Sequence, residues 1–372
     1  MKSLVKLSIL YALTFGAVSC VAQKSVSVDK QNYINLKWNQ IATRMPDEWY
    51  ATKEAKMAAD SVLKYQTNVG GWSKNHNYHL GFNQDEWAKI KSSGIGATFD
   101  NGATLTEMKF LVNMYSKIKD ERYRNAFNKA FDYILIAQYE NGGWPQFYPF
   151  RKGQSIAYNS HITYNDNAMV NVMTFLKDIA DKKPFYQPMQ ISQKMTEKAK
   201  IAFDKGVDCI LKTQIRVNGK PTVWCAQHDE VTLAPANARA YELASFSGAE
   251  SVNITLLLMD IENPPREIIN AVKAAKSWFE THKVEGIRLE KIINSDGLKD
   301  LIAVEDKDAP VLWARFYDLD TALPYFCDRD GIKRKSFGEM GHNRRNGYSW
   351  YTNAPLKIIA KYPEWLQKWN VN

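Results

Sequence analysis

The same short pattern occurs three times in the chain, and it constrains the fold more than any other feature. "DSVLKYQTNVGGW" occupies residues 60–72 and "DYILIAQYENGGW" residues 132–144, while "DCILKTQ" at residues 208–214 leads to Trp224 through a longer turn. Apolar residues three and four positions apart before each glutamine indicate the end of an amphipathic helix. The copies begin 72 and 76 residues apart.

A second element follows each turn. "ATFDNGAT" (97–104) and "ITYNDNAM" (162–169) share a Thr–aromatic–Asx–Asx start and precede apolar helical stretches, and "PANARAYELASFSGAESVNITLLLM" (235–259) is the third copy. Each unit therefore consists of a helix, a turn, a loop and a second helix. Units that cannot bury their own apolar faces imply a closed array of helix pairs. We expect an all-α dominated fold, an (α/α)₃ toroid with long irregular loops and short β-segments.

The two Gly-Gly-Trp turns have two readings. The glycines can permit a positive φ at a helix end while the tryptophan fills the space between helices, which is a structural role. Alternatively, the turns line a cleft in which Trp72, Lys74 or Asn75 contacts a substrate. The two roles are compatible.

The N-terminus has the pattern of an export signal. Lys2 and Lys6 precede an apolar run at residues 7–18, which is too short to span a bilayer. We expect a signal peptide at residues 1–22 and one catalytic domain at residues 23–372, exported from a bacterial cell and either secreted or periplasmic. Residues 17–20 loosely resemble a lipobox, which leaves a lipid anchor at Cys20 as the alternative. No later segment is predicted to cross a membrane.

The charge of the chain favours an anionic partner. Removal of residues 1–22 takes away two lysines, so that 47 basic and 40 acidic residues remain, a net charge of +7. An exported chain without a basic run or a nucleic-acid-binding motif is predicted to bind an acidic polysaccharide rather than nucleic acid. The cysteines that remain are too widely spaced for a disulfide framework or a zinc site. Nothing in the sequence indicates an assembly larger than a monomer.

Two clusters of Asp and Asn occupy corresponding places in successive units, Asp100-Asn101 and residues 165–167. Their ordinary role would be helix N-capping. A toroid also gathers equivalent helix termini at one end of the molecule, so Asp100 and Asp166 could converge. Carboxylate oxygens suit Ca²⁺. Because two carboxylates do not complete a calcium shell, substrate and water would supply the other ligands.

The C-terminal third places four arginines, Arg315, Arg329, Arg344 and Arg345, among aromatic residues. The rings belong to Trp313, Tyr317, Tyr325, Trp350 and Tyr351. One reading is ordinary ion pairing, of Arg315 with Asp318 and of Arg329 with a flanking aspartate. The other is a binding site for acidic sugars, since a guanidinium grips carboxylates with two hydrogen bonds and aromatic rings stack on sugar faces.

Seven ordered segments give the chain a family resemblance between residues 50 and 365. They are "GGWSKN", "TFDNGAT", "GGWPQFYP", "TYNDNAM", "WCAQHDEVTLAPANARAYELASFSGAES", "WARFYDLDTALPYFCDRDG" and "RRNGYSWY". Together they resemble the pectate lyases of polysaccharide lyase family 10. The resemblance implies an (α/α)₃ toroid that binds polygalacturonate and cleaves it by β-elimination with Ca²⁺, giving 4,5-unsaturated oligogalacturonides.

The resemblance also implies roles for single residues. Asp166 would be a calcium ligand, Asp100 the second acidic residue of that centre, and Arg329 the base that removes the C5 proton. Arg315 and either Arg344 or Arg345 would grip substrate carboxylates. The chain departs from the family pattern at three positions, which concern contacts with the substrate: Ala234 replaces a lysine, Asn343 a glutamate and Lys335 a tyrosine.

Two other functions remain as alternatives. A glycoside hydrolase on the same toroid would use a carboxylate pair as acid and base, and Asp100 with Asp166 could supply it. A surface protein that binds acidic polysaccharide without cleaving it would need only the arginines and the rings. The product separates the first alternative from a lyase, because elimination alone creates a C4–C5 double bond. Binding without turnover would identify the second.

Overall fold

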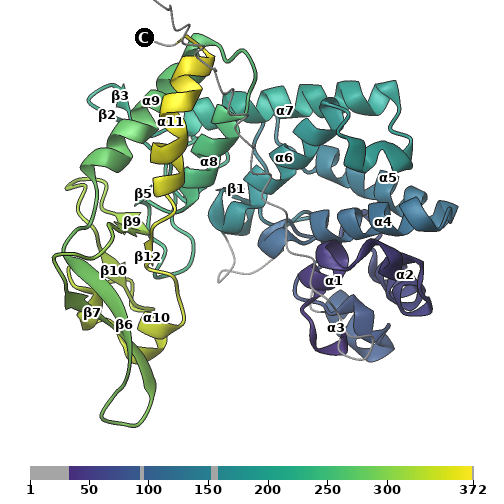
Figure 1. Cartoon of the computed structure of the whole chain (residues 1–372), viewed down its shortest axis with the longest axis horizontal. Coiled ribbons are helices and arrows are strands. Elements are labelled where there is room, and N and C mark those ends of the chain that lie inside the picture. Colours follow the sequence, from purple (N-terminus) through teal and green to yellow (C-terminus); the bar gives the residue numbers. More distant parts are fainter. Residues whose placement is uncertain (1–32, 93–95, 152–157, 371–372) are drawn as a thin grey trace, which may run out of the picture.

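Three successive helix pairs form the body of the protein in the computed structural model, which describes residues 33–92, 96–151 and 158–370 (Figure 1). The pairs are α4 (Leu105–Lys117) with α5 (Glu121–Ile136), α6 (Ala168–Ala180) with α7 (Gln193–Thr213), and α8 (Glu250–Met259) with α9 (Arg266–Thr281). The first helices contact one another in sequence, α4 with α6 and α6 with α8. Among the second helices, α7 contacts α9, α2 (Lys53–Tyr65) contacts α5, and Gln138 just after α5 bonds to Ala202 of α7. The pairs thus form an inner and an outer row.

Burial separates the two rows. The inner helix α6 buries side chains on most of its sides, including consecutive residues from Ala168 to Val170. The outer helix α9 buries one stripe, consisting of Ile268, Ala271, Val272, Ala275, Trp278 and Phe279. Spacings of three and four residues place this stripe on one helix face. The inner row therefore forms the core and the outer row covers it.

The repeated tryptophans are structural. Trp72, Trp144 and Trp224 are at most 1% exposed. Each donates its indole N–H to a main-chain carbonyl of the preceding helix, at 2.8 Å (Val62), 2.9 Å (Ile134) and 2.7 Å (Ile210). The structural reading of these turns is therefore correct for the tryptophans.

The repeated glutamines connect neighbouring outer helices. The amide of Gln138 donates to Gly142 O in its own turn at 3.0 Å and to Ala202 O of α7 at 2.8 Å. Gln66 makes the equivalent pair of bonds toward α5, and Gln214 makes it toward α9. One side chain thus closes a turn and joins two units.

A fourth tryptophan occupies the equivalent position after α9. Trp313 is buried and donates its indole N–H to Phe279 O at 2.8 Å. A β-hairpin of β6 (Ile287–Ile293) and β7 (Lys299–Glu305) lies between this helix and Trp313 in the sequence. The hairpin separates Trp313 from the end of α9 by more than 30 residues, so the sequence showed three copies of the pattern and not a fourth.

Short antiparallel ladders connect the loops. β1 (Ile162–Thr163) pairs with β4 (Gln227–His228), β5 (Phe246–Ser247) with β9 (Phe316–Tyr317), and β8 (Trp313–Ala314) with β12 (Tyr351–Thr352). The other pairs are β2 (Arg216–Val217) with β3 (Lys220–Pro221) and β10 (Phe326–Cys327) with β11 (Lys333–Arg334). These segments agree with the short β-segments expected among long loops.

The remaining helices lie at the two ends of the chain. α1 (Trp38–Arg44) packs on α4, and α3 (Gln84–Ser92) lies against Tyr65 of α2, whose hydroxyl donates to Glu86 Oε2 at 2.8 Å. α10 (His342–Asn346) contacts β7, and α11 (Leu356–Lys368) packs against α8 and α9. Short 3₁₀-helices include η4 (Asp100–Gly102) and η6 (Asn165–Asn167). Figure 1 shows the β6–β7 hairpin and α10 projecting from the helical body on the side away from α2 and α3.

Part of what the sequence predicts lies outside the described residues, namely the signal peptide at residues 1–22, its cleavage site and the lipid anchor at Cys20. Within the described part, no helix combines the length and the hydropathy needed to cross a bilayer. Cys209, Cys225 and Cys327 are buried free thiols.

Candidate active site

A cavity of about 740 Å³ lies between the helical body and the C-terminal region. The N-terminal wall includes Lys74, Asp100, Asn165 and Asp166, and the central loops add Gln227, Arg239 and Glu242. The C-terminal wall includes Leu301, Arg315, Phe337, Tyr348 and Tyr351. The cavity therefore gathers five of the residues that the sequence singled out, Lys74, Asp100, Asp166, Arg315 and Tyr351.

The two acidic residues stand on neighbouring 3₁₀-helices. η4 and η6 contact each other, and each contains a left-handed residue, Asn101 at φ 52° and Asp166 at φ 51°. The helices that follow them have no side-chain N-cap hydrogen bond. The capping reading is thus wrong here. This left-handed conformation, which costs about 1–3 kcal/mol, falls on Asp166 itself in η6 and on Asn101, next to Asp100, in η4. All three residues line the cavity, and functional sites are where such strain is usually found.

Lys74 neutralises Asp100. The Asp100 side chain is buried, and one of its oxygens pairs with the Lys74 ammonium. The other oxygen, Oδ1, has no hydrogen-bond partner. A buried carboxylate oxygen without a partner is energetically unfavourable unless a ligand completes it. This position therefore suits a cation or a donor group of a substrate.

Arg315 holds the second acidic residue in place. Its Nη2 donates to Asn165 Oδ1 at 2.9 Å, pairs with the buried Glu250, and lies 3.8 Å from Asp166 Oδ1. Asn165 in turn donates to Asp166 Oδ2 at 3.0 Å. Burial raises the pKa of Asp166, and neighbouring carboxylates add to this effect while Arg315 opposes it. Hydrogen bonds and ion pairs hold the cluster on the Arg315 side, and Asp166, whose side chain is 42% exposed, is open to solvent.

A second arginine, Arg239, lies on the central wall. Its guanidinium grips Glu242 through two hydrogen bonds, one of them Nε to Oε2 at 2.7 Å, and stands 4.8 Å from the ring centre of Tyr241. Burial lowers the pKa of Arg239, but its bonds to Glu242 outweigh this and hold the pKa above its ordinary value. Unlike Arg315, the Arg239 side chain is 42% exposed. It is therefore the more accessible of the two.

Three residues that line the cavity carry a buried side-chain oxygen without a hydrogen-bond partner. Besides Asp100 Oδ1, the buried side-chain oxygens of Gln146 and Gln227 have no hydrogen-bond partner. With the carboxylate of Asp166 they form a set of oxygen donors, which is the set that Ca²⁺ prefers. The residues present therefore fit the calcium that the sequence resemblance implies, and they equally suit sugar hydroxyls.

Two predicted substrate residues lie elsewhere. Asn75 lines a neighbouring cavity of about 270 Å³ and accepts a hydrogen bond at 3.2 Å from Asn101, which lines both cavities. Arg345 pairs with the buried Asp300 and donates to Met340 O at 2.6 Å, so that its guanidinium is engaged within the protein. Asn75 is therefore adjacent to the main cavity, while Arg345 has a structural role.

The predicted base and its neighbour line a separate cavity. Arg329 and Arg344 border a space of about 700 Å³ together with Asp328, Asp330 and Asn343. Arg344 stacks on Tyr241, with its guanidinium carbon 3.8 Å from the ring centre. Arg329 therefore does not share a cavity with Asp100 and Asp166 in this conformation.

The simple ion pairs expected for these arginines do not form. Asp318 pairs with Lys333 rather than with Arg315. The aspartates on either side of Arg329 pair with Arg334. Arg315 lies between short strands rather than on a helix, so the spacing of three residues brings no helical neighbour.

Sequence reasoning missed three charged residues of the cavity region, Arg239, Glu242 and Glu250. Arg239 and Glu242 stand three residues apart in "ARAYE" beside a tyrosine, which is the same arginine–aromatic association that singled out the C-terminal arginines. That signal could have found Arg239. Glu250 is identified only by its partner Arg315, 65 residues away.

Comparison with known proteins identifies the family. The family model described as pectic acid lyase matches residues 66–359. The solved family 10 polysaccharide lyase from Cellvibrio cellulosa is 37% identical over 88% of this chain and 94% of that chain, with a TM-score of 0.72. A mutant of that enzyme in complex with trigalacturonic acid is 38% identical over 86% and 95%, with a TM-score of 0.71. No curated protein sequence matches.

These similarities confirm the helix-pair toroid. The matched residues 66–359 include both walls of the cavity. They also favour a lyase over the hydrolase and binding-protein alternatives. The chain belongs to the pectic acid lyase family and is a pectate lyase of the family 10 type.

Proposed function

We propose that this lyase cleaves polygalacturonate by Ca²⁺-dependent β-elimination in the 740 Å³ cavity. The observation that carries the proposal is the meeting of two carboxylates, Asp100 and Asp166, with two arginines, Arg239 and Arg315, on the walls of one cavity. The trigalacturonic acid bound by the related enzyme supports the substrate class.

β-Elimination requires removal of the weakly acidic C5 proton of the uronate, so the site must make this proton more acidic. The C5 proton lies next to a carboxylate, so its removal adds charge beside an existing charge. Bound Ca²⁺ would supply Lewis-acid stabilisation of that carboxylate. Asp166 and Asp100 Oδ1, with the amide oxygens of Gln146 and Gln227 nearby, would hold the ion.

Arg315 is suited to holding a substrate carboxylate. Glu250 and Asn165 fix its guanidinium from one side, and its Nε–H has no partner. These bonds hold the Arg315 guanidinium in a fixed direction, which limits the entropy lost when it binds a carboxylate. Tyr351 and Tyr348 lie on the same wall, and the Arg315 guanidinium stands 4.5 Å from the ring centre of Tyr348.

We assign the base to an arginine, with Arg239 as the favoured residue and Arg329 as the alternative from the sequence. Arg239 lines the cavity and is accessible, which supports it. Its bonds to Glu242 favour the protonated form, so a base role requires Arg239 to leave Glu242 when substrate binds. A base must also come within hydrogen-bond distance of the C5 proton.

The first experiment follows the ultraviolet absorbance of the unsaturated product from polygalacturonate at alkaline pH, with calcium and then with excess chelator. Absorbance that rises with calcium and stops with chelator supports the proposal. New reducing ends without absorbance would indicate hydrolysis. Polymer binding without either signal would indicate a binding protein.

A pair of variants then assigns the base. Arg239→Lys should lower kcat at least about 100-fold while polygalacturonate still binds, because general base catalysis contributes about 10²–10⁴-fold. Arg329→Lys serves as the matched control and should keep most of its activity. The reverse pattern would return the role to Arg329.

We also propose that the protein is exported through residues 1–22 and acts as a monomer. Mass spectrometry of the mature protein would distinguish the two possible N-termini, Gln23 after ordinary signal-peptide cleavage and lipid-modified Cys20 for an anchored protein. Sedimentation would measure the oligomeric state.

A further inference from the structure

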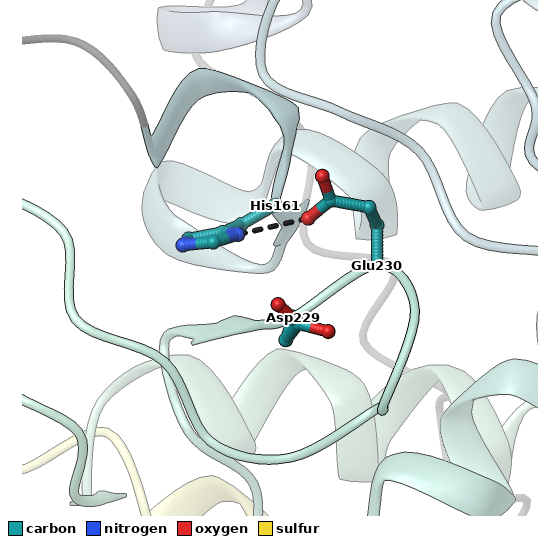
Figure 2. Close-up of side chains that lie close together, drawn as sticks. All are labelled: His161, Asp229 and Glu230. Carbon is teal, nitrogen blue, oxygen red and sulfur yellow. Dashed lines mark hydrogen bonds and ion pairs between the residues drawn. The ribbon is translucent and has the colours of Figure 1, made fainter. Parts of the chain in front are cut away.

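Three potential metal ligands lie together outside the cavity. Figure 2 shows His161 facing Glu230, with Asp229 beside them. His161 Nδ1 is 2.9 Å from Glu230 Oε2, and one ligand atom from each of the three residues lies within 4.8 Å of the others. All three side chains are partly exposed, so solvent can complete the group.

The cluster stands at one end of the β1–β4 ladder. His161 immediately precedes β1, while Asp229 and Glu230 immediately follow β4. Ile162 pairs with His228 and Thr163 with Gln227, after which the chain runs into Asn165 and Asp166. The two ends of this short ladder thus carry the cluster on one side and cavity residues on the other.

The protein contains a second copy of the same loop, which provides an internal comparison. In β5–β9, Phe246 pairs with Tyr317 as Ile162 pairs with His228. Asp229 Oδ1 accepts from the amides of Val231 and Thr232 at 3.0 and 2.6 Å. Asp318 Oδ1 accepts from the amides of Asp320 and Thr321, both at 3.0 Å. The loops are therefore built alike.

The copies differ at the two other ligands. The register places Ser245 where the first copy has His161, and Leu319 where it has Glu230. The loop therefore needs its aspartate but neither the histidine nor the glutamate. In the second copy the other oxygen of Asp318 pairs with the Lys333 ammonium, so this position already accommodates a cation.

Neighbouring hydrogen bonds fix the backbone on both sides of the cluster. Asn141 of the second Gly-Gly-Trp turn donates to Glu230 O at 2.7 Å. Tyr139 of the same turn donates to Ser160 O, next to His161. A site whose ligands are held in this way loses little freedom on binding a metal.

We propose that His161, Asp229 and Glu230 bind a divalent transition metal of the Zn²⁺ class, with water as the remaining ligand. One imidazole nitrogen and two carboxylate oxygens are ligands that such metals accept, whereas the imidazole disfavours Ca²⁺. Zn–N and Zn–O bonds of about 2.0–2.2 Å place tetrahedral ligand atoms roughly 3.3–3.6 Å apart. The three ligand atoms lie within 4.8 Å of one another, and a metal would replace the 2.9 Å hydrogen bond between His161 Nδ1 and Glu230 Oε2, so small side-chain movements suffice to reach this separation.

The metal has a structural role in this proposal. It joins the segment before β1 to the loop after β4, and so restrains the ladder that leads to Asp166 and Gln227. The site is independent of the calcium proposed for the cavity, because it shares no ligand with it. Its failure would leave the proposed lyase reaction untouched.

The test uses the full chain, freed of metal and then dialysed against Zn²⁺ in the presence of excess Ca²⁺. We expect about one equivalent of zinc per chain and a higher melting temperature with zinc than without. His161→Ser and Glu230→Leu, which copy the second loop, should bind at least about tenfold more weakly. His76→Ser is the matched control, since His76 also contacts a glutamate, Glu86, at 3.0 Å, and it should keep the zinc.

Cobalt gives a readout that does not depend on stability. In the wild type, Co²⁺ absorption in the visible region should show tetrahedral nitrogen and oxygen ligands. Glu230→Gln should give the same absorption at lower affinity. This conservative variant keeps the test possible even if Glu230→Leu or His161→Ser prevents folding. Absence of zinc and cobalt binding by the wild type would overturn the proposal and leave an ordinary His–Glu ion pair. Unchanged binding by His161→Ser would overturn the assignment of the ligands.

Discussion

Glu107 is a buried carboxylate whose protonation affects stability. It is 2% exposed, accepts the indole N–H of Trp38 at 2.7 Å on one oxygen, and has no hydrogen-bond partner on the other. Burial raises the pKa of Glu107 to about 7. The folded protein therefore binds more protons than the unfolded chain between about pH 4.5 and 7, and stability falls as the pH rises through this window.

We predict that Glu107→Gln stabilises the protein at alkaline pH. The amide keeps the oxygen that accepts from Trp38 and removes the buried charge, which costs up to about 3 kcal/mol above pH 7. Urea unfolding at pH 5 and pH 8.5 measures the effect, with little difference from wild type at pH 5 and a gain at pH 8.5. Glu121→Gln is the control, because Glu121 is exposed and accepts from Tyr115 at 2.7 Å. Parallel pH profiles for Glu107→Gln and wild type would contradict the prediction.

At the scale of single residues, the sequence located the carboxylates better than the arginines. Asp100 and Asp166 lie in repeated motifs, so their convergence follows from the repeat of the fold. Arg315 was found among aromatics, but its partners Glu250 and Asn165 are 65 and 150 residues away. Such pairs depend on how distant loops pack, and local spacing carries no information about them. The base assignment stays a prediction for the same reason.

At the scale of elements, the turn glycines bring neighbouring units into contact. Gly142 has φ +92°, and a Cβ atom there would lie 2.0 Å from Lys205 O of α7. Gly70 makes the equivalent close approach, 2.4 Å from Lys129 O of α5. The turn thus touches the backbone of the next outer helix, next to the bonds that Gln138 and Gln66 make.

We predict that Gly142→Ala destabilises the protein far more than Gly81→Ala. Gly81 has a similar φ, +96°, but a Cβ atom there would meet no atom within 4 Å. Gly81→Ala should therefore lose only the backbone contribution, about 1–3 kcal/mol. Gly142→Ala adds a clash that α7 must move to relieve. Denaturant unfolding compares the two, and equal losses would mean that the contact between turn and helix is unimportant.

The elements themselves were predictable where they repeat. Helix ends before Gln66, Gln138 and Gln214 follow from apolar spacing, and their glutamines mark the same junction each time. The fourth junction, at Trp313, was hidden because the β6–β7 hairpin separates the tryptophan from α9. An insertion leaves the packing position intact but removes the local pattern. Two-residue strands are similarly invisible in sequence, because their pairing partners are distant.

At the scale of the whole molecule, the cavity depends on how the C-terminal region is held against the helical body. β7 contributes Leu301 to the cavity, and the last residue of α10 with the chain after it contributes Asn346 to Tyr351. Asp300, one residue before Leu301, connects these two segments. It accepts from Arg345 Nε at 3.0 Å and from Asn346 Nδ2 at 2.7 Å. The Arg345 guanidinium holds the pKa of Asp300 well below its ordinary value.

We predict that Asp300→Asn lowers kcat/KM for polygalacturonate roughly tenfold, although Asp300 does not line the cavity. The reason is that a small displacement of one cavity wall misplaces the groups that bind the sugar. The sign of the pKa shift means that the ion pair stabilises wild type above about pH 4 and is lost only in stronger acid. The variant should therefore melt at a lower temperature at neutral pH, with the difference shrinking as the pH falls below about 4. Asp306→Asn is the control, since Asp306 pairs with Arg288 on the same hairpin at 3.1 Å and does not line the cavity. If both variants retain full kcat/KM while only Asp300→Asn melts earlier, the hairpin stabilises the fold without shaping the site.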